Sequence, residues 1–438
     1  MRILLILPLI VFLSSCSAFD STEEEPPLPG ERLSILDLQE DLVPVEAANL
    51  EGISVPTPIP NNEWSQNGRT PSHIIGNLEV TDVQNIEQIW RSDIGEGRTA
   101  RLPLITQPVV GNGKVFTIDT KSSVRAFNAQ TGKSLWSENI RPEGEDESVI
   151  AGGLAYNDNK LFVSGGYNEV LALNAETGEI LWRRSISAGS RAAPNILNNR
   201  VFVKTLNNNI VALNAMDGTP LWEYEGVGEV TGLLGTATPA VDEQIVVAPF
   251  SSGDVAALRI ENGSVIWTDR LINNLQLSSL SALADIRGLP VIENDTIYAV
   301  SFGGKFVAID KTTGIRKWAK DISSSETPLI VGNTIYVMEA ENRMIALNKE
   351  TGDALWIKQL EKYENPEKKR DRIFWSGPLM INGKLMTISN NGIMSLLEPQ
   401  TGEFIKQYNL KIESNIPAVI AGGTIFIVSA NGNLIAYR

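Results

Sequence analysis

The stretch from Val170 to Trp182 reads VLALNAETGEILW, and variants of it recur along most of the chain. Six Gly-x-x-x-Trp motifs and one further apolar segment place seven of the nine tryptophans at one position of a repeat, and Lys406 takes that position after Gly402. Successive positions lie 38 to 51 residues apart, a period typical of propeller blades. The repeat tryptophans are Trp90, Trp136, Trp182, Trp222, Trp267, Trp318 and Trp356.

Each repeat has the residue pattern of four short strands. A proline opens most repeats, alternating apolar and polar residues follow, and a Thr-Gly turn often precedes the strand that ends at the tryptophan. Alternation with period two indicates half-buried strands, and glycine supplies positive φ in tight connections at little steric cost. Because a lone blade cannot cover its two faces, blades must stack around an axis, and a tryptophan is suited to the gap between them.

The repeats predict eight blades. The last repeat, Pro417 to Arg438, supplies three strands and stops without a Thr-Gly-x-x-x-Trp strand. The segment Ile86 to Trp90 has the pattern of that missing strand, and pairing the two ends would remove an open sheet edge. The sequence therefore predicts an all-β fold over residues 62–438. We expect an eight-bladed β-propeller of four-stranded antiparallel blades, closed by its N- and C-terminal segments.

Composition excludes several classes of function. The chain has 438 residues, a formal net charge of −15 and a pI near 4.8, which argues against nucleic-acid binding because that needs a cationic surface. The single cysteine excludes a disulfide framework and a cysteine-cluster metal site. The single histidine, His73, excludes multi-histidine sites, so we expect it to have a surface or packing role. No catalytic, metal or cofactor-binding residues are predicted.

The first residues read as an export signal. Residues 1–15 combine one arginine with an apolar run that is too short to span a membrane. Leu13-Ser14-Ser15-Cys16 looks like a bacterial lipobox, which predicts a palmitate-type acyl anchor on Cys16; an ordinary signal peptide with an incidental cysteine is the alternative. Residues 16–61, acidic and rich in proline, are predicted to be a tether between lipid and propeller. The residue after Cys16 is serine and not aspartate, which favours the outer membrane, with the chain facing the periplasm.

The motif Ala-Leu-Asn-Ala-x-Thr-Gly-x-x-x-Trp resembles the PQQ-like repeat of quinoprotein propellers. With the lipobox, the acidic tether and eight repeats, the chain resembles the BamB family of outer-membrane assembly lipoproteins. Residues 64–68, 233–235 and 283–290 are similar to segments of its alphaproteobacterial members. The resemblance implies a non-catalytic scaffold of the BAM complex without a cofactor. Such a scaffold binds the POTRA domains of the barrel subunit BamA and assists the insertion of outer-membrane proteins, which are possible partners in unfolded form.

Two other classes remain open at this point. A PQQ-dependent quinoprotein dehydrogenase resembles the repeat equally well, although its adjacent-cysteine disulfide has no counterpart here. A propeller that binds peptide or carbohydrate in an unrelated role is the other alternative.

Partner contacts are expected on the connections between blades. The connection before Pro239 carries Leu233 and Leu234 in a glycine-rich loop, and the next long connection, before Pro290, carries Asp285 and Arg287. Consecutive connections meet on one rim of a ring, and apolar residues on a rigidly held loop favour an interaction patch. The resemblance places the family's contact with the barrel subunit there. The alternative is that Asp285 and Arg287 only hold down a long loop. The insertion Glu361 to Arg372 is expected to be a solvated loop.

Overall fold

The computed structural model describes residues 42–45, 52–226, 236–272 and 285–438. The chain divides into two compact units, Met1–Leu42 and Val43–Arg438. The signal peptide, Cys16 and most of the predicted tether lie outside the described residues, so the account below concerns the second unit. No helix in the described part of the chain has the length and apolarity that a membrane crossing needs.

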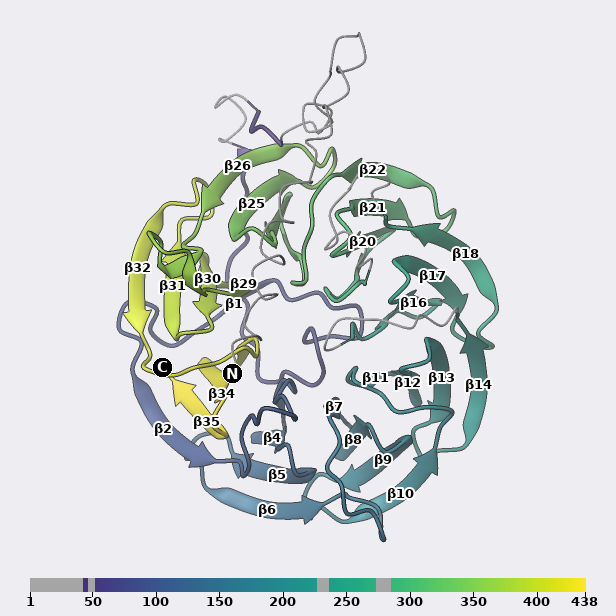
Figure 1. Cartoon of the computed structure of the whole chain (residues 1–438). Helices are drawn as coiled ribbons and strands as arrows, with labels where there is room; N and C mark the ends of the chain where they lie inside the picture. The colour runs from purple at the N-terminus through teal and green to yellow at the C-terminus, as the bar shows by residue number, and fades with distance from the viewer. Residues whose placement is uncertain (1–41, 46–51, 227–235, 273–284) are drawn as a thin grey trace, which may run out of the picture. The chain divides into compact units, whose positions relative to one another are not determined.

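The described residues of this unit form eight four-stranded antiparallel blades around an axis, which confirms the predicted fold (Figure 1). Written from the inner to the outer strand, the first two blades are β3 (Val109–Gly111), β4 (Lys114–Ile118), β5 (Ser123–Asn128), β6 (Ser134–Asn139), and β7 (Ala151–Asn157), β8 (Lys160–Gly165), β9 (Glu169–Asn174), β10 (Ile180–Ser185). The next two are β11 (Asn195–Leu197), β12 (Arg200–Lys204), β13 (Asn209–Asn214), β14 (Pro220–Glu225), and β15 (Ala240–Val241), β16 (Ile245–Pro249), β17 (Asp254–Arg259), β18 (Val265–Arg270).

The fifth and sixth blades are β19 (Val291–Glu293), β20 (Thr296–Val300), β21 (Phe306–Asp310), β22 (Arg316–Lys320), and β23 (Leu329–Val331), β24 (Thr334–Met338), β25 (Arg343–Asn348), β26 (Ala354–Gln359). The seventh is β29 (Trp375–Ile381), β30 (Lys384–Ser389), β31 (Ile393–Leu397), β32 (Phe404–Asn409), with β1 (Asn77–Leu78) added in parallel to β29. The eighth is β33 (Val419–Ala421), β34 (Thr424–Ser429), β35 (Asn433–Tyr437) and β2 (Gln88–Asp93). A separate hairpin pairs β27 (Tyr363–Asn365) with β28 (Arg370–Arg372).

The eighth blade joins the two ends of the repeat region, as predicted. Strand β2 pairs antiparallel with β35, with Trp90 opposite Ala436. Backbone hydrogen bonds between Glu87 and Arg438 extend the pairing by one residue. Strand β2, which overlaps the predicted segment Ile86 to Trp90 and continues to Asp93, is thus the outer strand that the last repeat lacks.

Each repeat tryptophan links its blade to the next. The Trp136 indole N–H donates to the Ala175 carbonyl of the following blade at 3.0 Å, and the other six make the equivalent bond at 2.9 to 3.2 Å. The indole also lies on the glycine of the next Thr-Gly turn. A Cβ on Gly178 would come within 2.7 Å of the Trp136 ring, and φ there is +81°. The glycine and the tryptophan of the motif therefore serve neighbouring blades, and together they set the spacing of the ring.

The eighth junction has neither of these residues. Ile86 stands where the other blades have the glycine, four residues before the repeat tryptophan. Lys406 stands where the preceding blade would have its tryptophan, and its ammonium group donates to the Gln84 carbonyl at 2.6 Å. The Tyr408 hydroxyl donates to the same carbonyl at 2.8 Å. Polar contacts thus replace the indole at the one junction where no glycine makes room for it.

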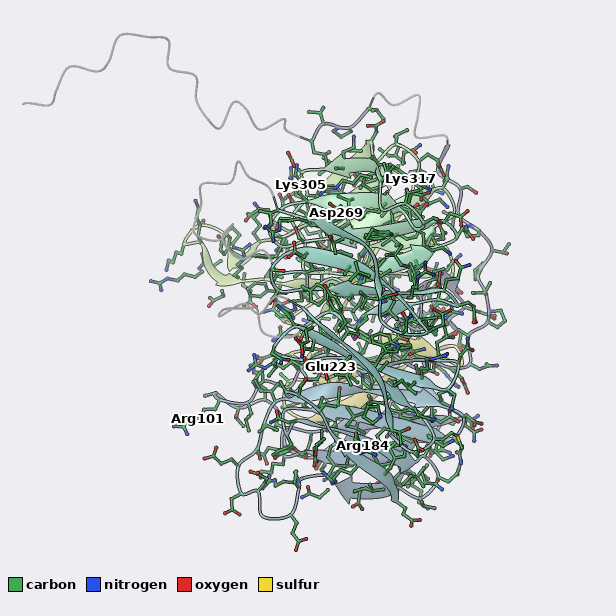
Figure 2. All side chains as sticks on the ribbon, turned by 90° about the vertical axis from the view of Figure 1, so that its right-hand side faces the viewer. Arg101, Arg184, Glu223, Asp269, Lys305 and Lys317 are labelled. Atoms are coloured by element: carbon green, nitrogen blue, oxygen red, sulfur yellow. The ribbon has the colours of Figure 1, made fainter. Side chains whose placement is uncertain are left out.

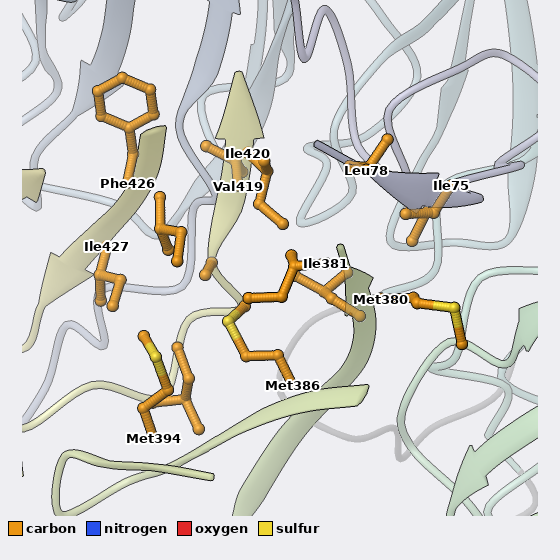
Figure 3. Packing of buried hydrophobic residues seen from close by; sticks show 14 of the residues in the cluster. Ile75, Leu78, Met380, Ile381, Met386, Met394, Val419, Ile420, Phe426 and Ile427 are labelled. Carbon is orange, nitrogen blue, oxygen red and sulfur yellow. The ribbon is translucent and has the colours of Figure 1, made fainter. Parts of the chain in front are cut away.

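The centre of the ring is held by a segment that has no repeat pattern. Residues 59–80, which we term the hub segment, circle the axis (Figure 1) and bond to the inner strands of seven blades. The Trp64 N–H and carbonyl, for example, both pair with Val110 of β3, at 2.9 and 2.8 Å. Ile75 and Leu78 of the hub segment pack close to β29 and β33 (Figure 3). The partners in chain order are Gly422 after β33, Val110 of β3, Tyr156 of β7, Ile196 of β11, Val241 of β15, Ile292 of β19, Met380 of β29 and Gly423.

The structure also places part of the predicted tether on the propeller. The Ser54 N–H donates to the Asn333 side chain at 2.9 Å, and Ile53 is buried. Residues 52–61 are therefore in contact with the blades.

Candidate partner-binding face

The connections between blades all lie on one face of the ring, which we term the link face. In a four-stranded antiparallel blade, the inner strand begins and the outer strand ends on the same side, so each outer-to-inner connection lies there. Seen edge-on, Arg101 on the connection from β2 to β3 stands out from this side of the ring (Figure 2). The hub segment bonds near the far ends of the inner strands, so it lies toward the opposite face.

A cavity of about 150 Å³ occupies the axis on the link-face side. Trp64, Asn67 and Ile75 of the hub segment line it, together with the starts of inner strands and the connections before them. The hub segment thus gives the axial cavity a floor, and the link face gives it a mouth. The polar side chains that line it from the connections include Gln107, Arg191, Arg287, Glu326 and Asn415.

Arg287 is exposed and lines this mouth. It lies close enough to Glu326, on the next connection, to stabilise that carboxylate. Burial nevertheless raises the pKa of Glu326, against the opposing effects of Arg287 and of a hydrogen bond from the Gly377 N–H at 3.2 Å. The structure therefore shows one predicted contact residue at the surface, in an electrostatic pair beside the axis.

Asp285 is buried, whereas a direct partner contact would require it to lie at the surface. Its side chain is only 2% exposed, and its main-chain carbonyl accepts a hydrogen bond from the Phe302 N–H at 3.1 Å. Lys204, at the end of β12, is also buried, and its Nζ lies 5.9 Å from the centroid of the Phe250 ring. Burial lowers the pKa of Lys204 to about 8, and the charge of Asp285 acts in the opposite direction. In this position Asp285 takes part in holding the connection to the blades, so any effect on a partner would act through the position of that connection.

The remaining predicted contact residues, Leu233 and Leu234, lie outside the described residues. Thr236, the first described residue after them, lines the axial cavity beside Arg287. The described ends of the two long connections, at Thr236 and Arg287, therefore line the same mouth.

His73 is a packing residue of the hub segment. It is 1% exposed, and its Nδ1 lies 2.7 Å from the Pro290 carbonyl oxygen. Burial lowers its pKa to about 4, although the contact with Pro290 acts in the opposite direction. A neutral histidine thus joins the hub segment to the start of β19.

The insertion Glu361 to Arg372 is more ordered than a solvated loop. It contains the β27–β28 hairpin, and its base is fixed where the Asn342 side-chain amide donates to the Glu361 and Ile373 carbonyls, both at 2.9 Å. Its tip residues, Glu367 to Arg370, are exposed. The ordered part arises because Trp375 and Ile373 beside it are buried in the core.

The eight blades and their repeat motif define a propeller of the PQQ-repeat class, and the hub segment closes its axis on the side opposite the link face. The sequence profile of the family described as outer membrane protein assembly factor BamB matches residues 120–358 and 327–438. The chain belongs to that family.

Curated relatives agree with this assignment. The outer membrane protein assembly factor BamB of Kangiella koreensis is 32% identical over 251 residues, which cover 57% of this chain and 63% of the relative. That of Shewanella oneidensis is 27% identical over 257 residues, covering 56% of this chain and 65% of the relative. The chain thus spans somewhat less than two thirds of the length of the curated relatives it matches.

Solved structures share the fold. BamB from Moraxella catarrhalis superposes with a TM-score of 0.69 at 20% identity, covering 81% of this chain and all of that one. The quinohemoprotein alcohol dehydrogenase of Comamonas testosteroni superposes with a TM-score of 0.63 at 13% identity, covering 90% of this chain and 82% of that one. At these identities the likeness concerns the fold alone.

Proposed function

We propose that this protein is a non-catalytic accessory subunit of the outer-membrane β-barrel assembly machinery, anchored through a lipid on Cys16 and facing the periplasm. The observation that carries the proposal is the match of the BamB family profile across residues 120–438. In this role the chain is a scaffold that brings the barrel subunit and its clients together. The lipobox and the proline-rich tether of the sequence support the anchor.

The proposed partner surface is the link face beside the axial cavity, and the proposed partner is the set of POTRA domains of the barrel subunit. Leu233 and Leu234 would supply apolar contacts, and Arg287 an exposed charge at the cavity mouth. Asp285 would hold the connection that carries Arg287. Apolar anchors inside a polar rim are typical of interface hot spots. Because the hub segment joins seven inner strands, the connections start from a rigid base.

Titration of purified chain against POTRA domains tests this proposal. Replacing Leu233 and Leu234 with glutamate would place two charges in a desolvated contact, and we expect a loss of several kcal/mol of binding. Arg287→Glu should weaken binding less if it lies at the rim. Ile315→Glu is the matched control, because Ile315 is an exposed aliphatic residue, 68% accessible, on a turn of the opposite face. Unchanged affinity in a folded Leu233/Leu234 variant would remove this surface from the proposal.

Catalysis is tested separately. Addition of PQQ and calcium to the purified chain, followed by a dye-coupled oxidation assay with alcohols, should give no turnover. Turnover above that of a heat-denatured control would show that the chain is a dehydrogenase and would contradict the proposal of a non-catalytic scaffold.

A further inference from the structure

The outer strands share a second feature that the repeat motif encodes. In all eight blades the pairing of the two outermost strands skips the residue just before the repeat position, which makes it the extra residue of a β-bulge. A bulge at an edge re-aims one side chain and interrupts further pairing. In five blades that side chain is aliphatic and more than 40% exposed: Ile89, Leu135, Leu181, Leu221 and Ile405.

Three blades differ, with Ile266, Lys317 and Leu355 at the bulge, and for Leu355 on β26 the difference has a visible cause. On β26 the bulge residue Leu355 is only 7% exposed and its neighbour Ala354 only 2%, against 45% for Leu135 and 46% for Leu181. The Val45 N–H donates to the Ala354 carbonyl at 2.9 Å. Val45 is half-buried against the core cluster that contains Leu355 and Trp356. Residue Val45 of the chain itself thus contacts this edge.

The occupied edge shows what such a site recognises. The outer strand offers a carbonyl just before the bulge, and the bulge offers an aliphatic side chain beside it. In the segment Val43-Pro44-Val45, Val45 donates its backbone N–H to that carbonyl and packs its aliphatic side chain against the core cluster. These are the two kinds of contact that β-augmentation uses, in which the main chain supplies the bond and alternate side chains supply selectivity.

We propose that the same sites on β2, β6, β10, β14 and β32 bind extended aliphatic segments of another, unfolded polypeptide. The argument is one of equivalence: these edges carry the same bulge, the same kind of side chain and a carbonyl at the same position as β26. In the described residues no further strand pairs with them. The bulge limits each contact to a short stretch, so each site holds its segment weakly and releases it.

This inference does not rest on the proposed link-face partner, because it concerns the circumference of the ring. It also has a matched control within the chain. Strand β22 carries Lys317 at the bulge position, an exposed residue of the wrong chemistry. A site built on the aliphatic side chain should be absent there.

The test is photo-cross-linking of the full chain with a peptide that copies residues 40–47 and carries photo-leucine at the position of Val45, followed by mapping of adducts by mass spectrometry. We expect adducts on β6, β10 and β14, and at least fivefold fewer on β22. Leu181→Lys should remove adducts from β10 while leaving β6 labelled, and Lys317→Leu should create them on β22. A peptide N-methylated at the same residue should label at least fivefold less, since it lacks the N–H.

Thermal unfolding of each variant is the control for folding, and little change is expected because these side chains are exposed. Equal labelling of β22 and β10 in the unmodified chain would overturn the proposal, as would equal labelling by the N-methylated peptide. Retention of the β10 adducts in Leu181→Lys would overturn it too. None of these results bears on POTRA binding, which the link-face variants test.

Discussion

The coupling between Trp90 and Gly132 gives the sharpest test of how the ring is spaced. A Cβ added to Gly132 would lie 2.6 Å from two ring carbons of Trp90, and φ at Gly132 is +70°. Gly132→Ala should therefore cost about 1 kcal/mol for the left-handed backbone and a further 1–3 kcal/mol, roughly, for overpacking against the indole. The sum is about 3 kcal/mol of unfolding free energy.

The second arm removes the indole. Trp90→Ala deletes a half-buried ring and its 3.2 Å hydrogen bond to the Ala129 carbonyl, and we expect a cost of about 3 kcal/mol, at the low end for large aromatic truncations. In that background Gly132→Ala no longer meets the ring, while Ser92 Oγ still lies 2.7 Å from the added Cβ, so the backbone cost of about 1 kcal/mol and part of the overpacking cost remain. The double variant should be more stable than the sum of the single effects by about 1–2 kcal/mol.

Urea denaturation followed by far-ultraviolet circular dichroism measures these differences, provided that the slope with denaturant is unchanged among variants. Gly113→Ala is the matched control: its φ is +71°, yet nothing lies within 4 Å of the added Cβ. It should cost about 1 kcal/mol whether or not Trp90 is present. Additive effects of Gly132→Ala and Trp90→Ala, within about 0.5 kcal/mol, would refute the view that the glycine exists to admit the preceding indole.

Three further outcomes are expected, two from the structure and one from the lipobox of the sequence. Lys406→Trp should lower stability by about 1–3 kcal/mol, because Ile86 stands where the other blades have the glycine; adding Ile86→Gly should recover part of the loss in thermal melts, and no recovery would count against this account of the eighth junction. Burial lowers the pKa of His73 to about 4, so below pH 6.5 the unfolded chain binds a proton that the folded chain does not. Stability should fall by about 3 kcal/mol between pH 6.5 and 4. In His73→Asn, whose asparagine tolerates the positive φ of 62° at this position, urea titrations should show a smaller loss of stability between pH 6.5 and 4. An equally large loss in this variant would mean that carboxylates, and not His73, cause the pH dependence. Cys16→Ala should abolish metabolic palmitate labelling and outer-membrane fractionation, and a variant that still incorporates label would disprove the lipid anchor.

The ring was predictable because its signal is repeated. Seven tryptophans at one position and a missing last strand were enough to predict both the blade count and the closure by β2 and β35. The bulge before each tryptophan also left a sign in the sequence. Pairs such as Leu135-Trp136 and Leu181-Trp182 put two apolar residues side by side, which breaks the alternation of a regular strand.

The hub segment and the buried Asp285 were not predictable in the same way. Residues 59–80 contribute roughly one hydrogen bond to each of seven blades, so they have no internal period. Only Trp64, a tryptophan outside the repeat position and buried in the structure, is a sequence signal that they lie in the core. Asp285 is an acidic residue on a long connection, where exposure is the ordinary expectation. The charge of Asp285 acts on the buried Lys204, 81 positions earlier in the chain, and a single sequence does not reveal such a long-range effect.

The hub segment and the eighth junction explain one another. The eighth blade is assembled from both ends of the repeat region, and the junction before it lacks the indole–glycine contact that spaces the other seven. The hub segment meets this blade twice: the Asn61 carbonyl accepts from the Gly422 N–H at 2.7 Å, and the Thr81 N–H, just beyond the segment, donates to the Gly423 carbonyl at 3.1 Å. Between these two contacts it passes the inner strands of six other blades. The hub segment therefore links the eighth blade to six other blades through hydrogen bonds around the axis. These bonds stabilise the junction that lacks the indole–glycine contact, so the ring does not depend on the side-chain packing of that junction alone.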